Sequence, residues 1–138
     1  MNFSTAVSTA LRQYARFSGR ARRSEYWWFL LFQTLVSVMA TVIDIAAFQS
    51  NGDETGPVGL LATVALLLPS LAVTVRRLHD VDHSGWFMLI GLIPIVGWII
   101  VLVALVKDSD SDNPYGPSPK YPTAPRLMDY PGHPQPTL

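Results

Sequence analysis

The chain has 138 residues, of which 49% are hydrophobic and only 14% are charged, and its ten basic and ten acidic residues cancel to a formal net charge of zero. With a mean hydropathy of +0.27 it is more apolar than a typical soluble domain of this length, so the composition favours a single-domain membrane protein. The absence of cysteine excludes disulfides, a thiolate nucleophile and thiolate metal ligands.

Residues 3–17 have the periodicity of an amphipathic helix, because apolar residues recur at steps of three and four. Ser18 and Gly19 should end this helix. We expect it either to lie in the headgroup region of a membrane or to pack its apolar stripe on the protein's own spans. The stripe consists of Phe3, Val7, Ala10, Leu11, Tyr14 and Phe17.

Residues 26–48 form a long apolar run in which Asp44 is the single charge. At about 1.5 Å per residue, a helix of this length can cross a hydrocarbon core of roughly 30 Å. The run is too long for the hydrophobic region of a cleavable signal, so we expect it to remain as an anchor. Polar residues recur along one side, which should face another helix or, as the alternative, line a path for a solute. They are Gln33, Ser37, Thr41 and Asp44.

Two further apolar runs cover residues 58–75 and 86–106. The second of these is interrupted by Gly91, Pro94 and Gly97, but it is long enough for one crossing. We therefore predict an all-α membrane protein with three transmembrane helices and an N-terminal amphipathic interfacial helix. The alternative is that the interruptions turn residues 86–106 into a re-entrant hairpin.

Basic residues beside the spans predict the orientation of the chain. Five arginines precede the first span, the loop at residues 49–57 has no Lys or Arg, and Arg76 and Arg77 lie in the next loop. The N-terminus and the Arg76 loop should therefore face the cytoplasm. Membrane-domain residues 1–106 are followed by residues 107–138, where eight prolines between Pro114 and Pro136 predict an extended, disordered tail. Three spans would place this tail on the far side, whereas a hairpin would return it to the cytoplasm.

Two charged segments, residues 17–28 and 76–86, should share the cytoplasmic layer, and both contain recognisable motifs. The first reads F-x-G-R-x-x-R-x-E-Y-W and the second R-R-L-H-D-x-x-x-S-G-W, followed by I-P-x-x-G and N-x-Y-G-x-x-P. With these motifs the chain resembles, over about residues 1–120, the bacterial inner-membrane proteins grouped as domain of unknown function 805. The resemblance implies a family without an established biochemical activity. The acidic residues 108–112 depart from its pattern, so nothing of the family is carried over to them.

The cytoplasmic layer should carry a surplus of positive charge. Seven arginines face three acids there, which leaves four positive charges in excess. Such a surplus should hold anionic lipid headgroups, at about 1 kcal/mol for each basic residue near the surface. The alternative is that the arginines only set the topology. The residues are Arg12, Arg16, Arg20, Arg22, Arg23, Arg76 and Arg77 against Glu25, Asp80 and Asp82.

Glu25 and Asp80 lie one step from the apolar boundary and beside arginines. Guanidinium–carboxylate pairs between the entry of the first span and the exit of the second would hold the bundle together, and we prefer this structural role to catalysis. His79 should act as a hydrogen-bonding or titrating group at the interface. The candidate residues for lipid or partner contact and for structural ion pairs are Arg20, Arg22, Arg23, Glu25, Arg76, Arg77, His79 and Asp80.

The sequence contains no motif of a known catalytic, cofactor or phosphate-loop site. His79 and His83, four residues apart, could suggest a metal site, but the following Ser84 and Gly85 indicate a turn, so we expect no metal. The aspartates of residues 108–112 imitate the first half of a calcium loop without its glycine and final glutamate. The basic residues lie beside spans and form no nucleic-acid stripe.

These observations favour a non-enzymatic component of the bacterial inner membrane that organises partners or anionic lipids through its basic cytoplasmic layer. The expected partners are membrane lipids, other membrane proteins or further copies of the chain. The main alternative is a small transporter or channel subunit that acts as a homo-oligomer, because three short spans enclose little volume. A membrane enzyme that uses His79 and Asp80 as acid and base on a lipid headgroup is a more distant alternative.

Overall fold

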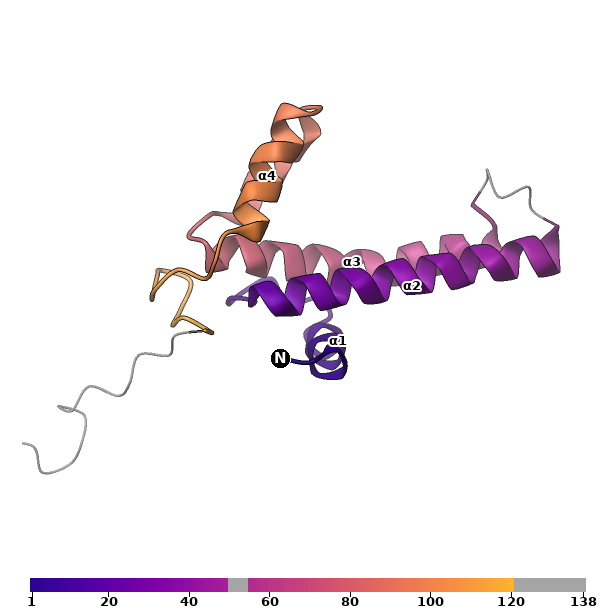
Figure 1. The fold of residues 1–138 in the computed structure, drawn as a ribbon, viewed down its shortest axis with the longest axis horizontal. Coiled ribbons are helices and arrows are strands. Elements are labelled where there is room, and N and C mark those ends of the chain that lie inside the picture. Colours follow the sequence, from indigo (N-terminus) through magenta and orange to yellow (C-terminus); the bar gives the residue numbers. More distant parts are fainter. Residues whose placement is uncertain (50–54, 121–138) are drawn as a thin grey trace, which may run out of the picture.

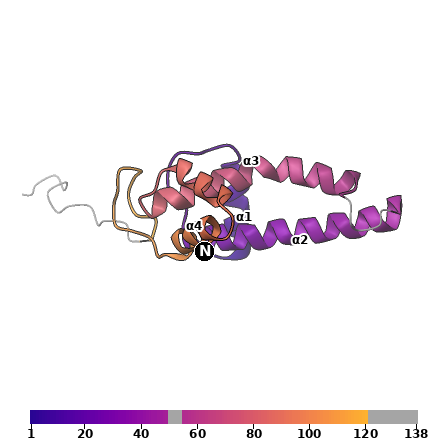
Figure 2. The same cartoon turned by 90° about the horizontal axis from the view of Figure 1, so that it is seen from above.

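The computed structural model describes residues 1–49 and 55–120, and the elements within these ranges are helical. Two long helices run side by side, a short helix lies across them, and a helical hairpin rises from one end of the pair (Figures 1 and 2). In chain order the elements are α1 (Phe3–Arg12), α2 (Arg23–Phe48), α3 (Pro57–Asp80), the 3₁₀ helix η1 (Gly85–Leu92) and α4 (Val96–Val106).

Helices α2 and α3 are the two elements of the described chain that are long and apolar enough to cross a membrane, judged by length and composition. With 26 and 24 residues they extend about 39 and 36 Å at 1.5 Å per residue. Both continue beyond the predicted apolar runs into charged sequence, since α2 begins at Arg23 and α3 ends at Asp80. Arg76 and Arg77 therefore lie on the last turns of α3 and not in the predicted loop, whereas Arg20 and Arg22 precede the first turn of α2.

The end of the helix pair away from these charges is closed by Asp44. Its carboxylate, on the last turns of α2, accepts the backbone N–H groups of Val58 at 2.9 Å and Gly59 at 2.7 Å in the first turn of α3. Such first-turn amides have no partner within their own helix. Gly56 lies so close that an added Cβ would collide with the Asp44 carboxyl group. Asp44 is thus an N-cap provided by the neighbouring helix.

The polar stripe predicted along α2 is divided between two faces. Gln33 accepts a 2.6 Å hydrogen bond from Ser70 of α3, and Asp44 is buried. Ser37 and Thr41 are exposed, and the Thr41 hydroxyl donates to the Ser37 carbonyl within its own helix. The inner half of the stripe therefore serves helix packing.

Residues 86–106 do not form the single span predicted from the sequence. They are divided into η1 and α4, which pack against each other as a hairpin. The turn forms because the Val96 N–H donates to the Pro94 carbonyl, around an Ile95 with φ of 64°, and because Gly97 lies against the Ile90 carbonyl where a Cβ would collide. The hairpin rises across the direction of α2 and α3 (Figure 1).

Helix α1 is shorter than the predicted residues 3–17 and packs on the two long helices. Ala6 and Ala10 are completely buried there, while Phe3 meets Trp28 of α2 edge-to-face. Figure 1 shows α1 nearly end-on beside α2, so it runs across the pair. Of the predicted apolar stripe, Ala10 packs on the protein's own helices, whereas Phe3, Leu11, Tyr14 and Phe17 are 37–40% exposed.

Candidate functional site: a buried arginine cluster

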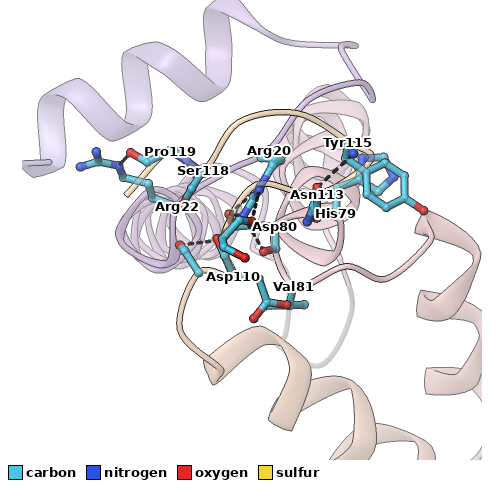
Figure 3. Close-up of polar contacts among 12 residues, drawn as sticks. Arg20, Arg22, His79, Asp80, Val81, Asp110, Asn113, Tyr115, Ser118 and Pro119 are labelled. Atoms are coloured by element: carbon cyan, nitrogen blue, oxygen red, sulfur yellow. Dashed lines mark hydrogen bonds and ion pairs between the residues drawn. The ribbon is translucent and has the colours of Figure 1, made fainter. Parts of the chain in front are cut away.

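Five charged residues meet at the end of the molecule where α2 begins and α3 ends. Because the two helices are antiparallel neighbours, this end gathers the linker before α2, the last turn of α3 and the segment after α4 (Figure 3). We call residues 108–119 the closing segment. The arginine cluster consists of Arg20, Glu25, Arg76, Arg77 and Asp80, each with a side chain at most 5% exposed.

Glu25 and Arg76 form the link between α2 and α3 within the cluster. The Arg76 guanidinium donates to the Glu25 carboxylate at 2.8 Å. The Arg76 Nε and Nη2 atoms are buried and have no hydrogen-bond partner among the described residues. Moving the two helix ends apart would leave each charge buried without its partner, which is costly. The pair therefore holds the start of α2 against the end of α3.

Asp80 lies between two guanidinium groups and is completely buried. One carboxylate oxygen pairs with Arg20 at 2.9 Å. The other accepts from Arg77 at 2.5 Å and from the Ser109 hydroxyl at 2.6 Å. The Asp80 carboxylate is therefore bonded to residues of three segments: the linker before α2, the end of α3 and the closing segment.

Arg20 organises the closing segment through its guanidinium group, which has five N–H donors. One donor goes to the Asp80 carboxylate and one to the Asp80 carbonyl. The other three go to the backbone carbonyls of Asp110, Ser111 and Gly116 at 2.7, 2.8 and 3.0 Å. Arg20 thus satisfies acceptors of α3 and of the closing segment at once (Figure 3).

Arg77 performs a similar task for the end of α4. Its Nε donates to the Leu105 carbonyl at 3.1 Å, and its Nη2 donates to the Lys107 carbonyl. The last carbonyls of a helix have no partner within it and carry partial negative charge, so a guanidinium there is favourable. The hairpin is in this way anchored to the end of α3.

His79 joins the linker to the closing segment. Its Nδ1 lies 3.1 Å from the Gly19 carbonyl, and because a carbonyl only accepts, Nδ1 carries the hydrogen. The imidazole stacks on the Tyr115 ring, with centroids 4.0 Å apart and planes inclined by 5°. Asn113 donates to the His79 carbonyl at 2.8 Å. His79 is therefore a packing and hydrogen-bonding residue here.

The closing segment falls within residues 107–138, the stretch predicted to be a disordered tail, but it makes defined contacts. The closing segment is held by Arg20, by Asn113 and by the stacking of Tyr115, whereas residues 121–138 lie outside the described part of the chain. Composition misses this order, because the acceptors that Arg20 binds are backbone carbonyls. The sequence signal that could have indicated it is the N-x-Y-G-x-x-P motif at residues 113–119.

Arg22 and Arg23 are not part of the cluster. Arg22 donates through Nε to the Pro119 carbonyl and points away from Arg20 (Figure 3). Arg23 is exposed, and its hydrogen bond within the described part of the chain is a long one of 3.4 Å to the Val106 carbonyl. The structure therefore divides the predicted candidate residues into the buried arginine cluster, the half-buried Arg22 and His79, and the exposed Arg23.

The described residues contain no group of three or more histidines and acids placed to hold a metal ion. His83, which the sequence places four residues after His79, bonds instead to the Val81 carbonyl at 2.6 Å. The two histidines thus have separate protein partners.

The fold and cluster define a class of small helical proteins in which two membrane-length helices are tied at one end by buried arginine–carboxylate pairs. The chain belongs to the family described as protein of unknown function (DUF805), whose model matches residues 14–117. This match includes the whole cluster and nearly all of the closing segment.

Two curated proteins of Escherichia coli (strain K12) are similar to the chain. Inner membrane protein YhaI is 40% identical over 114 residues, which cover 82% of this chain and 93% of that protein. Inner membrane protein YhaH is 39% identical over 115 residues, which cover 80% and 92%. No solved structure matches the chain.

Proposed function

We propose that the chain is a bacterial inner-membrane protein that crosses the bilayer twice, through α2 and α3, with its N-terminus and closing segment in the cytoplasm. The similarity to two proteins named for the inner membrane supports the location. Residues 24–75 contain no Lys or Arg, whereas arginines lie on both sides of this stretch. That distribution supports the orientation, because basic residues beside spans stay in the cytoplasm.

The hairpin replaces the third span in this proposal. Helix α4 has 11 residues and extends about 16 Å, roughly half of a 30 Å hydrocarbon core. Its surface is strongly apolar, with Trp98 67% and Val103 64% exposed. We therefore place η1 and α4 against the cytoplasmic leaflet, from which residues 108–119 return to the arginine cluster.

The proposed activity is non-enzymatic binding of anionic lipid headgroups at the cytoplasmic end. The observation that carries this proposal is the division of the arginines. The side chains of Arg20, Arg76 and Arg77 are buried and paired, so they act structurally. The arginines of the N-terminal part outside this cluster are more accessible, since Arg12, Arg16 and Arg23 are exposed and Arg22 is half-buried. Asp80 is completely buried between guanidinium groups, which argues against its use as a catalytic acid or base. The arginines left for lipids are Arg12, Arg16, Arg22 and Arg23.

Native mass spectrometry of the detergent-solubilised protein, titrated with phosphatidylglycerol or phosphatidylcholine, tests the lipid proposal. We expect phosphatidylglycerol to be retained at lower concentration, since each basic residue near an anionic surface contributes about 1 kcal/mol. Equal retention of the two lipids would refute it.

A reporter fused after Leu138 tests the topology. With two spans and a hairpin, the reporter should be active in the cytoplasm, and a second reporter inserted between α2 and α3 should be active in the periplasm. A periplasmic reporter after Leu138 would instead require residues 86–106 to cross the membrane.

A further inference from the structure

A small pocket lies where α2 begins, beside the junction of α4 with the closing segment. Its volume is about 180 Å³, below the roughly 300–1,000 Å³ of sites for drug-sized ligands. It can therefore hold a compact group and not a whole lipid. The residues that line it are Arg22, Arg23, Ser24, Asp108, Ser109 and Lys120.

The lining of this pocket favours an anion. It carries three cationic side chains and one carboxylate, which leaves two positive charges in excess. Among the described residues, Arg22 donates through its Nε to the Pro119 carbonyl, and Arg23 donates through one Nη atom to the Val106 carbonyl at 3.4 Å. Both guanidinium groups therefore retain N–H donors, and such donors match phosphate oxygens in geometry and charge.

The backbone at the start of α2 adds to this preference. Arg22 is the N-cap residue of α2 and makes no side-chain capping bond. The N–H groups of Arg23 and Ser24 are first-turn amides without a helical partner, and an anion beside them also meets the positive end of the helix dipole.

The position of the pocket along α2 indicates a lipid source for the anion. Trp27 and Trp28 follow the pocket residues by about one helical turn and are 37% and 38% exposed. Exposed tryptophans typically mark the level of the membrane–water interface. A group bound beside Arg23 would then lie at the height of the lipid phosphates.

We propose that this pocket binds the phosphate group of a glycerophospholipid headgroup, with the acyl chains remaining in the bilayer. This assignment rests on the proposed lipid-binding function and gives it a defined site. Arg22, Arg23 and Lys120 provide the positive charge, and Ser24 and Ser109 provide hydroxyl groups.

Asp108 opposes the binding of a phosphate. Its carboxylate pairs with Lys120 and accepts the Ser109 N–H at 2.9 Å, so it already neutralises part of the cationic lining. A phosphate has to compete with this carboxylate for Lys120. Removal of the Asp108 charge should therefore strengthen binding, whereas removal of an arginine charge should weaken it.

Four variants test the pocket by the same native mass spectrometry titration with phosphatidylglycerol. Arg23→Gln should weaken binding about fivefold and Asp108→Asn should strengthen it about fivefold, which is the factor for one charge near an anionic headgroup. Arg16→Gln changes an exposed arginine outside the pocket. It should weaken binding clearly less than Arg23→Gln, because Arg16 contributes only to the general attraction of the surface for anionic lipid. Arg23→Lys keeps the charge, so it should retain most of the wild-type affinity for phosphatidylglycerol. Tryptophan-fluorescence melting of each variant checks that the fold is retained.

The outcomes separate this assignment from the proposed function. If the wild-type protein prefers phosphatidylglycerol but Arg23→Gln and Arg16→Gln weaken it equally, the pocket is refuted and general lipid binding stands. If the wild-type protein shows no preference, the proposed function itself fails. Glycerol 3-phosphate added in excess should not displace the lipid, and displacement would show that the pocket takes a free phosphate.

Discussion

Asp80→Asn should strongly destabilise the protein, because it removes the one carboxylate that two buried guanidinium groups share. The Arg20 and Arg77 side chains are 2% and 0% exposed, so neither can turn to water when the charge is lost. Breaking a buried pair from one side costs about 3–5 kcal/mol. Asparagine keeps one acceptor oxygen, so we expect a loss near 3 kcal/mol, which corresponds to a melting temperature lower by roughly 10 °C.

The four tryptophans of the chain allow this change to be followed by fluorescence during thermal unfolding in detergent. Asp82→Asn is a matched control, because Asp82 is exposed and has a φ of 59°, a conformation that asparagine tolerates well. The control should melt within about 0.5 kcal/mol of the wild-type protein. Equal melting of the two variants would show that the arginine cluster does not stabilise the fold.

Three further changes test other parts of the structure. Arg20→Lys should release residues 110–116, since an ammonium has three donors instead of five. Hydrogen exchange should then rise in these residues while α3 stays protected. Unchanged exchange would show that the Arg20 hydrogen bonds do not hold the closing segment. Asp44→Ala should cost about 1–2 kcal/mol by leaving the first amides of α3 without an acceptor, and an unaltered melting temperature would exclude this cap. The Lys120 hydrogen bond, with help from the Ser109 N–H, holds the pKa of Asp108 below its usual 3.8. The stabilising contribution of ionised Asp108 is therefore complete above pH 3.8 and is lost as the pH falls through the lower pKa of the folded state. In the wild-type protein, hydrogen-exchange protection of the closing segment should fall over this pH range, and in Asp108→Asn this pH dependence should be absent. The same pH dependence in both proteins would refute the pairing.

The two long helices could be predicted from the sequence because their apolar runs, residues 26–48 and 58–75, fall within the range of about 17–25 residues that a bilayer crossing needs. Their outer boundaries could not, since α2 starts at Arg23 and α3 continues to Asp80. The charged residues that are buried at these helix ends are paired across distant segments, Arg76 with Glu25 and Asp80 with Arg20. The length of an apolar run predicts whether a helix can cross the bilayer. The exact ends of the helix also depend on ion pairs with distant residues, which the run itself does not contain.

The hairpin at residues 86–106 could be predicted only in part. Gly91, Pro94 and Gly97 interrupt this apolar run, but its length of 21 residues favours one crossing. In the structure the interruptions prevail, because Pro94 has no N–H and Gly97 allows the close approach of the two limbs. The length of an apolar run and its breakers are separate constraints, and the breakers decide whether the run stays one helix.

The charged residues of the candidate site could be predicted from the sequence, but the contribution of the closing segment could not. Both carboxylates could be placed beside arginines from their positions at the ends of apolar runs. The closing segment could not be added, because Arg20 binds the carbonyls of Asp110, Ser111 and Gly116. Every residue has such a carbonyl, so nothing in the side chains marks these three.

The hydrogen bonds of Arg20 also set an order of assembly during synthesis. The arginine is made early, but one of its acceptors, the Gly116 carbonyl, lies 96 residues later in the chain. The long helices are therefore complete and ready for insertion while this guanidinium group still lacks part of its final environment. A chain that stops before residue 110 would hold both membrane-length helices and would leave Arg20 without the last partners that allow it to be buried.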